Sequence, residues 1–383
     1  MHNWLLPEYI EDILPAEAFF IEEMRRKLLD LFRAHGYQLV IPPMLEYLPS
    51  LLTGTGRDMD HKTFKVVDQL SGHLMGLRAD ITPQAARIDA HLLNRQGVVR
   101  LCYAGSVLHT LPGDVMQTRE PLQVGAELFG HAGIESDVEI QQLMLKALRA
   151  AGAENIHLDL GHVGIFRALM RRTGASDELE ADLFRALQGK DVPEISVLAS
   201  GLEKTVRQAI QSLPELYGGA EVLDKSQQVL PDWPEIRRAL DDLRAVAAQV
   251  EGMVASLCFD LAELRGYHYH SGAVFAAYVP GKAHAVALGG RYDEVGKTFG
   301  RARPATGFSL DLRALSGAAS PELPPAILAP YSQDAALQGK IAALRARGEV
   351  VVVELPGHEQ HRHELNCDRR LELRGSVWEV VEV

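Results

Sequence analysis

The sequence predicts an α+β protein with a mainly antiparallel sheet flanked by helices. Strand patterns cluster at 98–129 and at 256–288, and within each cluster the connections are short, which favours antiparallel pairing. The regular alternation of strand and helix that is typical of a doubly wound parallel sheet does not occur along the sequence. A length of 383 residues leads us to expect two or three domains, at about 100–200 residues per domain.

The first part of the chain is expected to form a helix and then a short strand. Apolar residues recur every three or four positions over 20–32, with charged residues between them, as in an amphipathic helix. Residues 37–41 predict a short buried strand, which the prolines at 42–43 end. A second helix is expected from Thr82-Pro83, because threonine caps a helix well and proline is tolerated in the first turn.

The middle of the chain predicts three strands and then a purely helical segment. Strands are expected at 98–104, 120–129 and 156–160, with a helix that ends at Gly152 before the third of them. From about 175 to 252, charged helical patterns dominate and strand patterns vanish. We therefore expect a helical insertion in this part of the chain.

Strand patterns resume after the insertion, at 256–264, 267–279 and 283–288. Pro280-Gly281-Lys282 predicts a hairpin turn, and Gly289 to Asp293 predict another turn. The composition of 316–325 is that of a linker. The expected organisation is thus a core over 1–315, a linker over 316–325 and a small α/β C-terminal domain over 326–383.

Composition and charge favour a reduced cytoplasmic protein without a nucleic-acid or membrane partner. Lys and Arg number 39 against 51 Asp and Glu, a net charge of −12, so the chain lacks the electrostatic footprint of a nucleic-acid-binding protein. Three widely spaced cysteines exclude a disulfide scaffold. No apolar run approaches the ~20 residues of a membrane span.

Two polar clusters on expected strands could carry a binding site. Gln123 and Glu127 lie four residues apart on one strand, so they share a face at a separation of about 13 Å. Burying an amide and a carboxylate is costly without a ligand or a partner, although a solvated strand face is an equally simple interpretation. Alternation also places Arg265, Tyr267 and Tyr269 on one strand face, for which an exposed ribbon is the simpler interpretation.

The sequence offers no pattern for a metal, a cofactor or a nucleophilic hydrolase. His358, His361, His363 and Cys367 are zinc-capable residue types, but their spacing matches no closed four-ligand site and favours a solvated loop. Gly54-Thr55-Gly56 is too short for a phosphate loop, and Ser106 lacks the residues that flank a nucleophile elbow. We expect no metal and no cofactor.

Five segments, taken in order, resemble class II aminoacyl-tRNA synthetases. YQLVIPPMLE (37–46) resembles motif 1, 98–127 is similar to motif 2, and ATGFSLDLRAL (305–315) resembles motif 3. LRGYHYHSGAVF (264–275) and GGRYDEVG (289–296) resemble the two segments peculiar to histidyl-tRNA synthetase. The resemblance implies the class II synthetase fold for 1–315 and a homodimer that forms through Leu39–Glu46.

The residues that would grip ATP depart from this resemblance. Where motif 2 carries Phe-Arg-x-Glu, this chain has His109 in place of the arginine and Leu111 in place of the glutamate. Where motif 3 carries Glu-Arg, it has Arg313-Ala314, one residue out of register, and Asp311 replaces a glycine. Adenylate formation depends on positioned positive charge, so we expect no catalytic residues and no aminoacylation.

The amino-acid side of the synthetase pocket is better retained. The positions that match the family's histidine-binding groups are Asp80, Thr82, Gln123, Glu127, Arg265 and Tyr292. Asp80 stands where glutamate is usual, and His270 stands where a second tyrosine is usual. The resemblance therefore implies a histidine pocket that is retained, altered or vestigial.

This combination resembles the ATP phosphoribosyltransferase regulatory subunit family. The resemblance implies a non-catalytic, allosteric protein that forms a hetero-octamer with the short-form catalytic subunit, activates the first step of histidine biosynthesis and takes part in histidine feedback. The main alternative is an active histidyl-tRNA synthetase with variant motifs. A paralogue with another aminoacylation-like reaction is a third interpretation, which no sequence feature supports.

Overall fold

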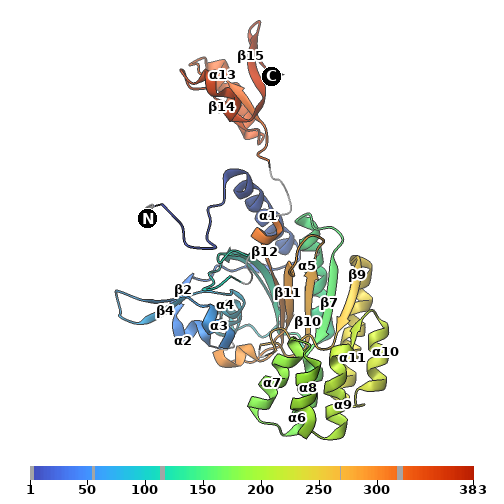
Figure 1. Cartoon of the computed structure of the whole chain (residues 1–383). Coiled ribbons are helices and arrows are strands. Elements are labelled where there is room, and N and C mark those ends of the chain that lie inside the picture. The colour runs from blue at the N-terminus through green and yellow to red at the C-terminus, as the bar shows by residue number, and fades with distance from the viewer. Residues whose placement is uncertain (1–3, 54–56, 113–116, 268, 317–321) are drawn as a thin grey trace. The chain divides into compact units, whose positions relative to one another are not determined.

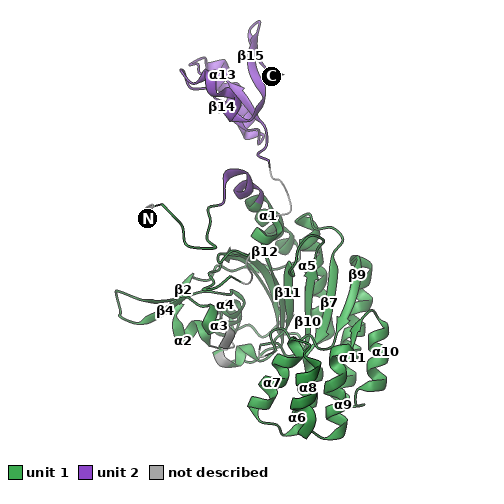
Figure 2. Cartoon of the chain, viewed as in Figure 1, with its two compact units in different colours: residues 1–12, 21–318 green, residues 13–20, 319–383 purple. Residues whose placement is uncertain are grey.

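The computed structural model describes residues 4–53, 57–112, 117–267, 269–316 and 322–383. The chain divides into two compact units, residues 1–12 with 21–318 and residues 13–20 with 319–383 (Figure 2). Gly54 to Gly56, His268 and part of the expected linker lie outside the described residues. Within the described parts of the chain, no helix combines the length and the apolar character needed to cross a bilayer.

A nine-stranded sheet forms the centre of the first unit (Figure 1). Its strand order is β1 (Gln38–Leu39), β5 (Val99–Ser106), β6 (Leu122–Phe129), β12 (Ala305–Asp311), β11 (Ala287–Arg291), β10 (Ala273–Tyr278), β7 (His157–His162), β9 (Ser256–Asp260) and β8 (Tyr217–Gly218). Only the β1–β5 and β7–β9 pairs are parallel. The predicted mainly antiparallel sheet is therefore confirmed.

Long helices bury the apolar face of this sheet. α5 (Ile134–Ala150) packs against β6, β11 and β12, and α11 (Pro234–Val250) packs against β7 and β10. α1 (Pro15–Ala34) brings the ring of Phe32 edge-on to Phe308 of β12, with centroids 5.9 Å apart. Because the central strands are covered on this side, the polar residues of β6 must be accommodated on the other side.

The opposite side of the sheet carries short helices and a small second sheet. α4 (Thr82–Arg87) continues into the π-helical turn η1 (Ile88–Leu93). A separate three-stranded sheet has the order β2 (Leu45–Tyr47), β4 (Leu74–Leu77) and β3 (Lys65–Val67), and it adjoins α2 (Leu48–Leu52) and α3 (Arg57–Lys62) in the chain. The β3–β4 hairpin projects from the body of the first unit (Figure 1).

The expected insertion is helical. After α6 (Val163–Thr173) come α7 (Asp177–Gln188), α8 (Val192–Leu198), α9 (Lys204–Ser212) and α10 (Glu221–Val229), before α11. Ser176 caps α7 by accepting a hydrogen bond from the backbone of Leu179, which is the usual role of serine at that position. The only strand described within 175–252 is the two-residue β8.

The second unit contains a four-stranded sheet and one long helix. The strand order is β14 (Val351–Val353), β13 (Ala326–Ala329), β15 (Cys367–Arg374) and β16 (Val377–Glu382), and α13 (Ala335–Ala346) adds apolar side chains to the same core. β15 was not predicted, because charged residues dominate its sequence and only Leu371 of its residues is buried. The small α/β character of the C-terminal segment is confirmed.

Three local expectations are wrong. Residues 37–41 do not form a buried strand: β1 is the edge of the sheet, and Leu39 and Ile41 are exposed. Gly289 and Gly290 lie in β11 and not in a turn. Glycine stands at both positions because a Cβ there would collide with a neighbouring strand. Residues 265–272 precede β10, so strand alternation does not govern their side chains.

Candidate functional site

A buried carboxyl group lies at the centre of the candidate site. Glu127 of β6 is 1% exposed, and its Oε1 accepts a hydrogen bond from the Tyr103 hydroxyl at 2.9 Å. Its Oε2 accepts a second bond from the Tyr292 hydroxyl. Thr82, the first residue of α4, bonds to the Tyr103 hydroxyl at 2.9 Å. Glu127, Thr82 and Tyr292 line a cavity of about 410 Å³, and Tyr103 lies behind them.

Glycine on the neighbouring strand makes room for this carboxyl group. Gly307 of β12 lies directly across from Glu127 in the antiparallel register. A Cβ at position 307 would overlap the Glu127 carboxyl group, so any larger residue would displace it. The contribution of the motif 3 segment at this point is therefore a glycine, which leaves space for the Glu127 carboxyl group.

Burial determines the charge of the centre. Desolvation raises the pKa of Glu127 from 4.5 to about 8, and the hydrogen bonds from Tyr292 and Tyr103 only partly oppose this rise. Burial, followed by the nearby Glu127, also raises the pKa of the Tyr103 and Tyr292 hydroxyls well above the ordinary value. Burial therefore favours the protonated form of the Glu127 carboxyl group, which lies between the hydroxyls of Tyr103 and Tyr292.

Asp80 and Gln123 form the wall beside α4. The Gln123 amide Nε2 donates to Asp80 Oδ1 at 2.7 Å, and its Oε1 accepts from the Ile81 backbone at 2.9 Å. Asp80 Oδ1 also accepts from the Thr82 backbone at 3.0 Å. Of the described residues, Asp80 and Thr82 line the cavity whereas Gln123 does not. Gln123 therefore positions Asp80 from behind.

Arg265 lines the cavity without reaching its centre. Its Nη2 lies 3.4 Å from both Glu263 Oε2 and the Tyr278 hydroxyl, and nearly half of its side chain is exposed. Arg265 therefore does not pair with Glu127. The guanidinium is held at the cavity wall, where one of its faces remains open to solvent.

His270 and Tyr269 also line the cavity, although neither was among the six predicted site residues. His270 Nδ1 lies 3.2 Å from the Arg265 carbonyl, which can only accept, so this nitrogen carries the ring proton. Burial lowers the pKa of His270 to about 4, which keeps the ring neutral. The Tyr269 hydroxyl is buried without a hydrogen-bond partner among the described residues. The departure of His270 from the family pattern was the available signal for that residue, and Tyr269 belonged to the polar cluster of Arg265 and Tyr267 for which an exposed ribbon was the simpler interpretation.

The insertion also reaches this pocket. Phe184 and Gln188 of α7 line the cavity, and the Tyr267 hydroxyl donates to Glu180 of the same helix at 2.6 Å. The ring of Phe184 lies 5.5 Å from that of Tyr267. The wall contributed by α7 could not be predicted, since about 80 residues separate it from Tyr267.

The matching positions for ATP provide no positioned cation. His109 Nε2 lies 3.0 Å from the Ala79 carbonyl, and burial lowers the pKa of this imidazole. Leu111 is largely exposed. The Arg313 guanidinium is engaged by the Glu120 carbonyl at 3.2 Å and by Glu11 at 3.1 Å.

Asp311 likewise serves the backbone. Its Oδ1 accepts from the backbone nitrogens of Leu122 and Arg313, each at 3.0 Å. Burial raises the pKa of Asp311 to about 6, and the two backbone bonds partly oppose this rise. This carboxyl group braces β6 against the start of α12 (Leu312–Ser316), at the point where motif 3 of a synthetase would meet the triphosphate.

Comparison with known proteins identifies the family. A family model described as histidyl-tRNA synthetase matches residues 9–315, and one described as ATP phosphoribosyltransferase subunit HisZ C-terminal domain matches residues 324–381. An ATP phosphoribosyltransferase regulatory subunit from Nitrosospira multiformis is 59% identical over 388 aligned residues, which cover 100% of this chain and 99% of that protein. This chain belongs to the ATP phosphoribosyltransferase regulatory subunit family.

Other members of this family and solved structures agree with the fold. The regulatory subunit from Cupriavidus taiwanensis is 58% identical over 99% of both chains. A structure from Bacillus halodurans, described as an ATP phosphoribosyltransferase regulatory subunit/histidyl-tRNA synthetase, has a TM-score of 0.83 at 25% identity and covers 95% of this chain and 97% of its own. Histidyl-tRNA synthetase from Nostoc has a TM-score of 0.79 at 18% identity, covering 100% and 97%, which confirms the synthetase-like fold alone.

Arg291, in the GGRYDEVG segment that resembles histidyl-tRNA synthetase, has a structural role. Arg291 donates to Asp137 Oδ2 through Nε at 3.0 Å and through Nη2 at 2.7 Å, and it bonds to Asp293 at 3.1 Å. Further bonds reach Ser136 and two backbone carbonyls of the 131–133 segment. With all its nitrogens engaged, Arg291 joins β11 to the start of α5, whereas the next residue, Tyr292, lines the cavity.

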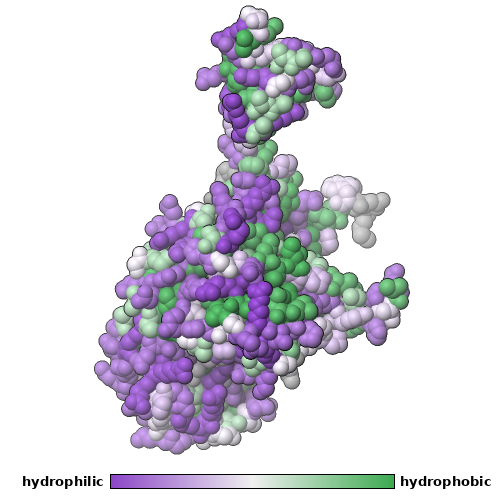
Figure 3. All heavy atoms as spheres, turned by 180° about the vertical axis from the view of Figure 1, so that it is seen from behind, coloured by the Kyte–Doolittle hydropathy of each residue, from purple (hydrophilic) through white to green (hydrophobic). Residues whose placement is uncertain are grey.

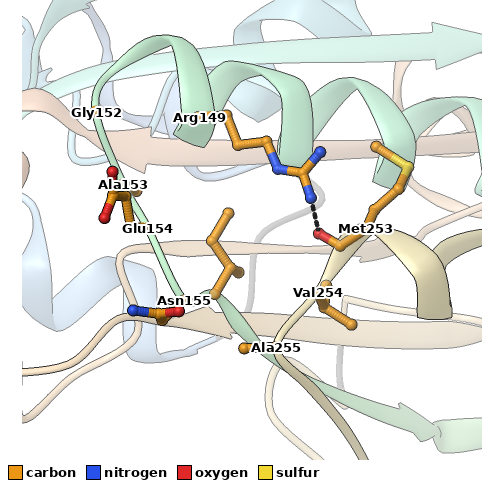
Figure 4. A pocket seen from close by; sticks show the side chains of 9 residues that line it. Arg149, Gly152, Ala153, Glu154, Asn155, Met253, Val254 and Ala255 are labelled. Atoms are coloured by element: carbon orange, nitrogen blue, oxygen red, sulfur yellow. Dashed lines mark hydrogen bonds between the residues drawn. The ribbon is translucent and has the colours of Figure 1, made fainter.

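A second cavity, of about 520 Å³, lies at the end of α5 (Figure 4). It is lined by Arg149, the segment 152–156 and the segment 253–255. The Arg149 guanidinium donates to the Met253 carbonyl at 2.6 Å, as the dashed line shows. Because its single guanidinium is bonded to the wall, this hollow lacks the convergent polar groups of a ligand site.

The histidines of the C-terminal segment do not assemble a ligand set. His361 Nδ1 lies 3.3 Å from Glu364, and His358 lines the same shallow hollow beside β14. Among the residues that the structure describes, no group of three or more His, Cys, Asp and Glu side chains could hold a metal ion.

The protonated Glu127 predicts a specific pH dependence of stability. Its folded pKa of about 8 exceeds the ordinary 4.5, so between these values the folded state keeps a proton that the unfolded state loses. The free energy of unfolding should therefore fall with rising pH in the unmodified chain relative to Glu127→Gln, which cannot ionise. Denaturant unfolding at pH 5, 6.5 and 8 checks this, with Glu294→Gln as an exposed control. Parallel curves for the unmodified chain and Glu127→Gln would contradict it.

Proposed function

We propose that this chain is the non-catalytic regulatory partner of the short-form ATP phosphoribosyltransferase catalytic subunit, in the first step of histidine biosynthesis. The observation that carries the proposal is the identity of 59% with a regulatory subunit over the full length of both chains. The match of residues 324–381 to the C-terminal domain of such subunits supports it independently of the synthetase-like core.

The main alternative, an active histidyl-tRNA synthetase, predicts the opposite result in a simple assay. Radioactive pyrophosphate exchange with histidine and ATP should stay at background for this chain. His109 is held by a backbone carbonyl and Arg313 by Glu11 and Glu120, so neither is free to stabilise phosphate charge. Exchange clearly above background that depends on histidine would refute the regulatory proposal and support the synthetase.

We propose that the chain forms a homodimer through Leu39–Glu46 and that such dimers enter a hetero-octamer with the catalytic subunit. β1 is an edge strand of the nine-stranded sheet, so its open side offers unpaired backbone groups. Leu39, Ile41, Leu45 and Tyr47 are exposed in the single chain, which leaves an apolar surface of the kind that interfaces cover.

Ile41→Asp should convert the dimer into monomers at micromolar concentration. Ile41 is 83% exposed, so a charge there costs the isolated chain little, whereas it would be costly at the centre of an interface. Sedimentation velocity measures the change, and Leu355→Asp, an exposed apolar position in the second unit, is the control. A dilute monomer of the unmodified chain would count against the homodimer.

We propose that free histidine binds the cavity around Glu127. Glu127, ionised once the ligand is bound, would accept a hydrogen bond from the ammonium or the imidazole. Asp80 and Thr82 would complete the amine site, and Gln123 would hold Asp80 in place. Arg265 would meet the carboxylate at the cavity wall, and Tyr292 would lie beside the ring while its hydroxyl donates to Glu127. Feedback by histidine would then act through this pocket and the assembly that surrounds it.

We also propose a domain organisation and a cellular location for the chain. A core over 1–315, a linker over 316–325 and a C-terminal domain over 326–383 agree with the limits of the two family models. A cytoplasmic location agrees with the three free cysteines.

A further inference from the structure

The hairpin formed by β3 and β4 presents apolar side chains to solvent. We call residues 65–77 the arm; it comprises β3, a six-residue turn and β4, and it projects from the first unit (Figure 1). Leu70 at its tip is 95% exposed, and Val67 and Leu74 are also exposed. A single exposed apolar residue is ordinary. Here Val67 and Leu74 pair directly across the hairpin and Leu70 lies at its tip, so the three side chains share one thin projection.

Hydrogen bonds with Asp68 fix the backbone of the turn that carries Leu70. Asp68 accepts from the backbone nitrogens of Leu70 and Ser71, each at 3.1 Å, and from the Ser71 hydroxyl at 2.5 Å. The Asp68 backbone donates to the His73 carbonyl at 2.9 Å, which closes the turn. These bonds also lower the pKa of the Asp68 carboxyl. A turn fixed in this way loses little conformational entropy when its apolar tip is covered.

The charges of the arm are already paired, which favours an apolar partner surface. Lys65 pairs with Asp60 of α3, with Nζ and Oδ1 2.8 Å apart, and Asp68 is used by the turn. The imidazole of His73 packs edge-on against the ring of Tyr47, with centroids 5.5 Å apart. The arm therefore offers leucine and valine side chains for contact and few free charges for steering.

The apolar surface of the arm continues into the edge of the main sheet. β4 pairs with β2, whose Leu45 and Tyr47 are exposed and follow the exposed Leu39 and Ile41 in the chain. Arg78, at the end of β4, fixes this relation by donating to the Pro42 carbonyl at 2.8 Å. From behind, Figure 3 shows apolar side chains gathered in the middle of the first unit, toward the side from which the arm projects.

The size of the edge indicates which partner covers the arm. A stable protein interface takes about 20–30 residues from each side, and the segment 39–47 alone provides eight, since Pro42 is buried. The arm adds twelve, since Gly76 is buried, and the two segments together reach the lower end of that range. We propose that the arm docks on a second copy of this chain, so that each subunit of the homodimer clasps the other. This inference rests on the proposed homodimer and adds to it a contact outside Leu39–Glu46.

Leu70→Asp tests the arm. Two arms are buried in a twofold-symmetric dimer, so we expect the dissociation constant of the dimer to rise by about ten- to a hundredfold. Sedimentation equilibrium over a dilution series measures it, and Val197→Asp, a similarly exposed apolar position on α8, should leave it unchanged. A change below twofold in Leu70→Asp, with the unmodified chain dimeric, would overturn the arm contact and leave the homodimer standing.

A second measurement needs no substitution. Hydrogen exchange of the amides at 65–77 should slow when the unmodified chain is concentrated from monomer to dimer, and exchange that is independent of concentration would overturn the proposal. Protection that appears only when the catalytic subunit is added would also overturn it, because the occupant would then be that subunit. If the unmodified chain remains a monomer at every concentration, the homodimer fails together with the arm.

Discussion

Addition of this chain to the short-form ATP phosphoribosyltransferase catalytic subunit should raise the rate of phosphoribosyl-ATP formation by about 5- to 150-fold, the range that corresponds to common allosteric coupling free energies. The chain keeps a synthetase-like core. The residues at its ATP-binding positions are engaged within the chain itself, as Arg313 is by Glu11. The fold can then contribute through binding to its partner. Activation requires that the active state of the catalytic subunit binds this chain more tightly than the inactive state does.

The measurement is the initial rate at increasing ratios of this chain to the catalytic subunit. This chain alone should form no product, and the rate should saturate once the catalytic subunit is fully bound. Ile41→Asp, if monomeric, separates the role of the homodimer from that of the single chain. An unchanged rate at a saturating ratio would refute activation in trans.

Substitution of Glu127 by alanine should weaken histidine binding by about ten- to a hundredfold. A hydrogen bond to a charged group contributes about 1.5–3 kcal/mol, and that free energy corresponds to this range of affinity. In the proposed complex Glu127 would meet the histidine ammonium together with Asp80, and the Tyr103 and Tyr292 hydroxyls are bonded to the two Glu127 oxygens. Isothermal calorimetry measures the loss, with Glu294→Ala as a control outside the cavity.

Binding should also release a proton from Glu127. Burial raises the pKa of this carboxyl to about 8, and a bound ammonium would favour the ionised form and lower that pKa. The heat of binding at pH 7 should therefore vary with the ionisation enthalpy of the buffer, and this variation should disappear in Glu127→Gln. An unmodified chain that binds no histidine at millimolar concentration would show that the cavity is a relic, and feedback would then act at an interface or on the catalytic subunit.

Much of the site could be predicted because the residues that carry it lie in short motifs. The order of five segments identified the synthetase-like core, and within it Glu127, Thr82 and Tyr292 meet at one cavity. Gln123 matched a histidine-binding position in the sequence, and in the structure its amide donates to Asp80 from behind the cavity wall. A motif fixes which residue type stands at a position, but it does not fix whether that side chain contacts a ligand or a neighbouring loop.

Other features depended on pairing between distant segments. Tyr103 contributes a hydroxyl to Glu127 because β5 lies beside β6, and Phe184 lines the cavity because α7 folds back onto Tyr267. β15 was missed because its apolar residues are few and its place beside β13 depends on parallel pairing across 40 residues. Local periodicity contains no information about such neighbours.

The sequence by itself determined the fold class, the order of the motifs and the loss of the phosphate-binding residues at His109, Leu111 and Ala314, because each depends on residue type and local spacing. The raised pKa of Glu127, the partners of Arg265 and the exposure of Leu39 and Ile41 followed only from the folded arrangement of the chain. Those properties depend on desolvation and on contacts between segments far apart in the chain. The same residue is ionised or protonated, and buried or exposed, according to what folds against it.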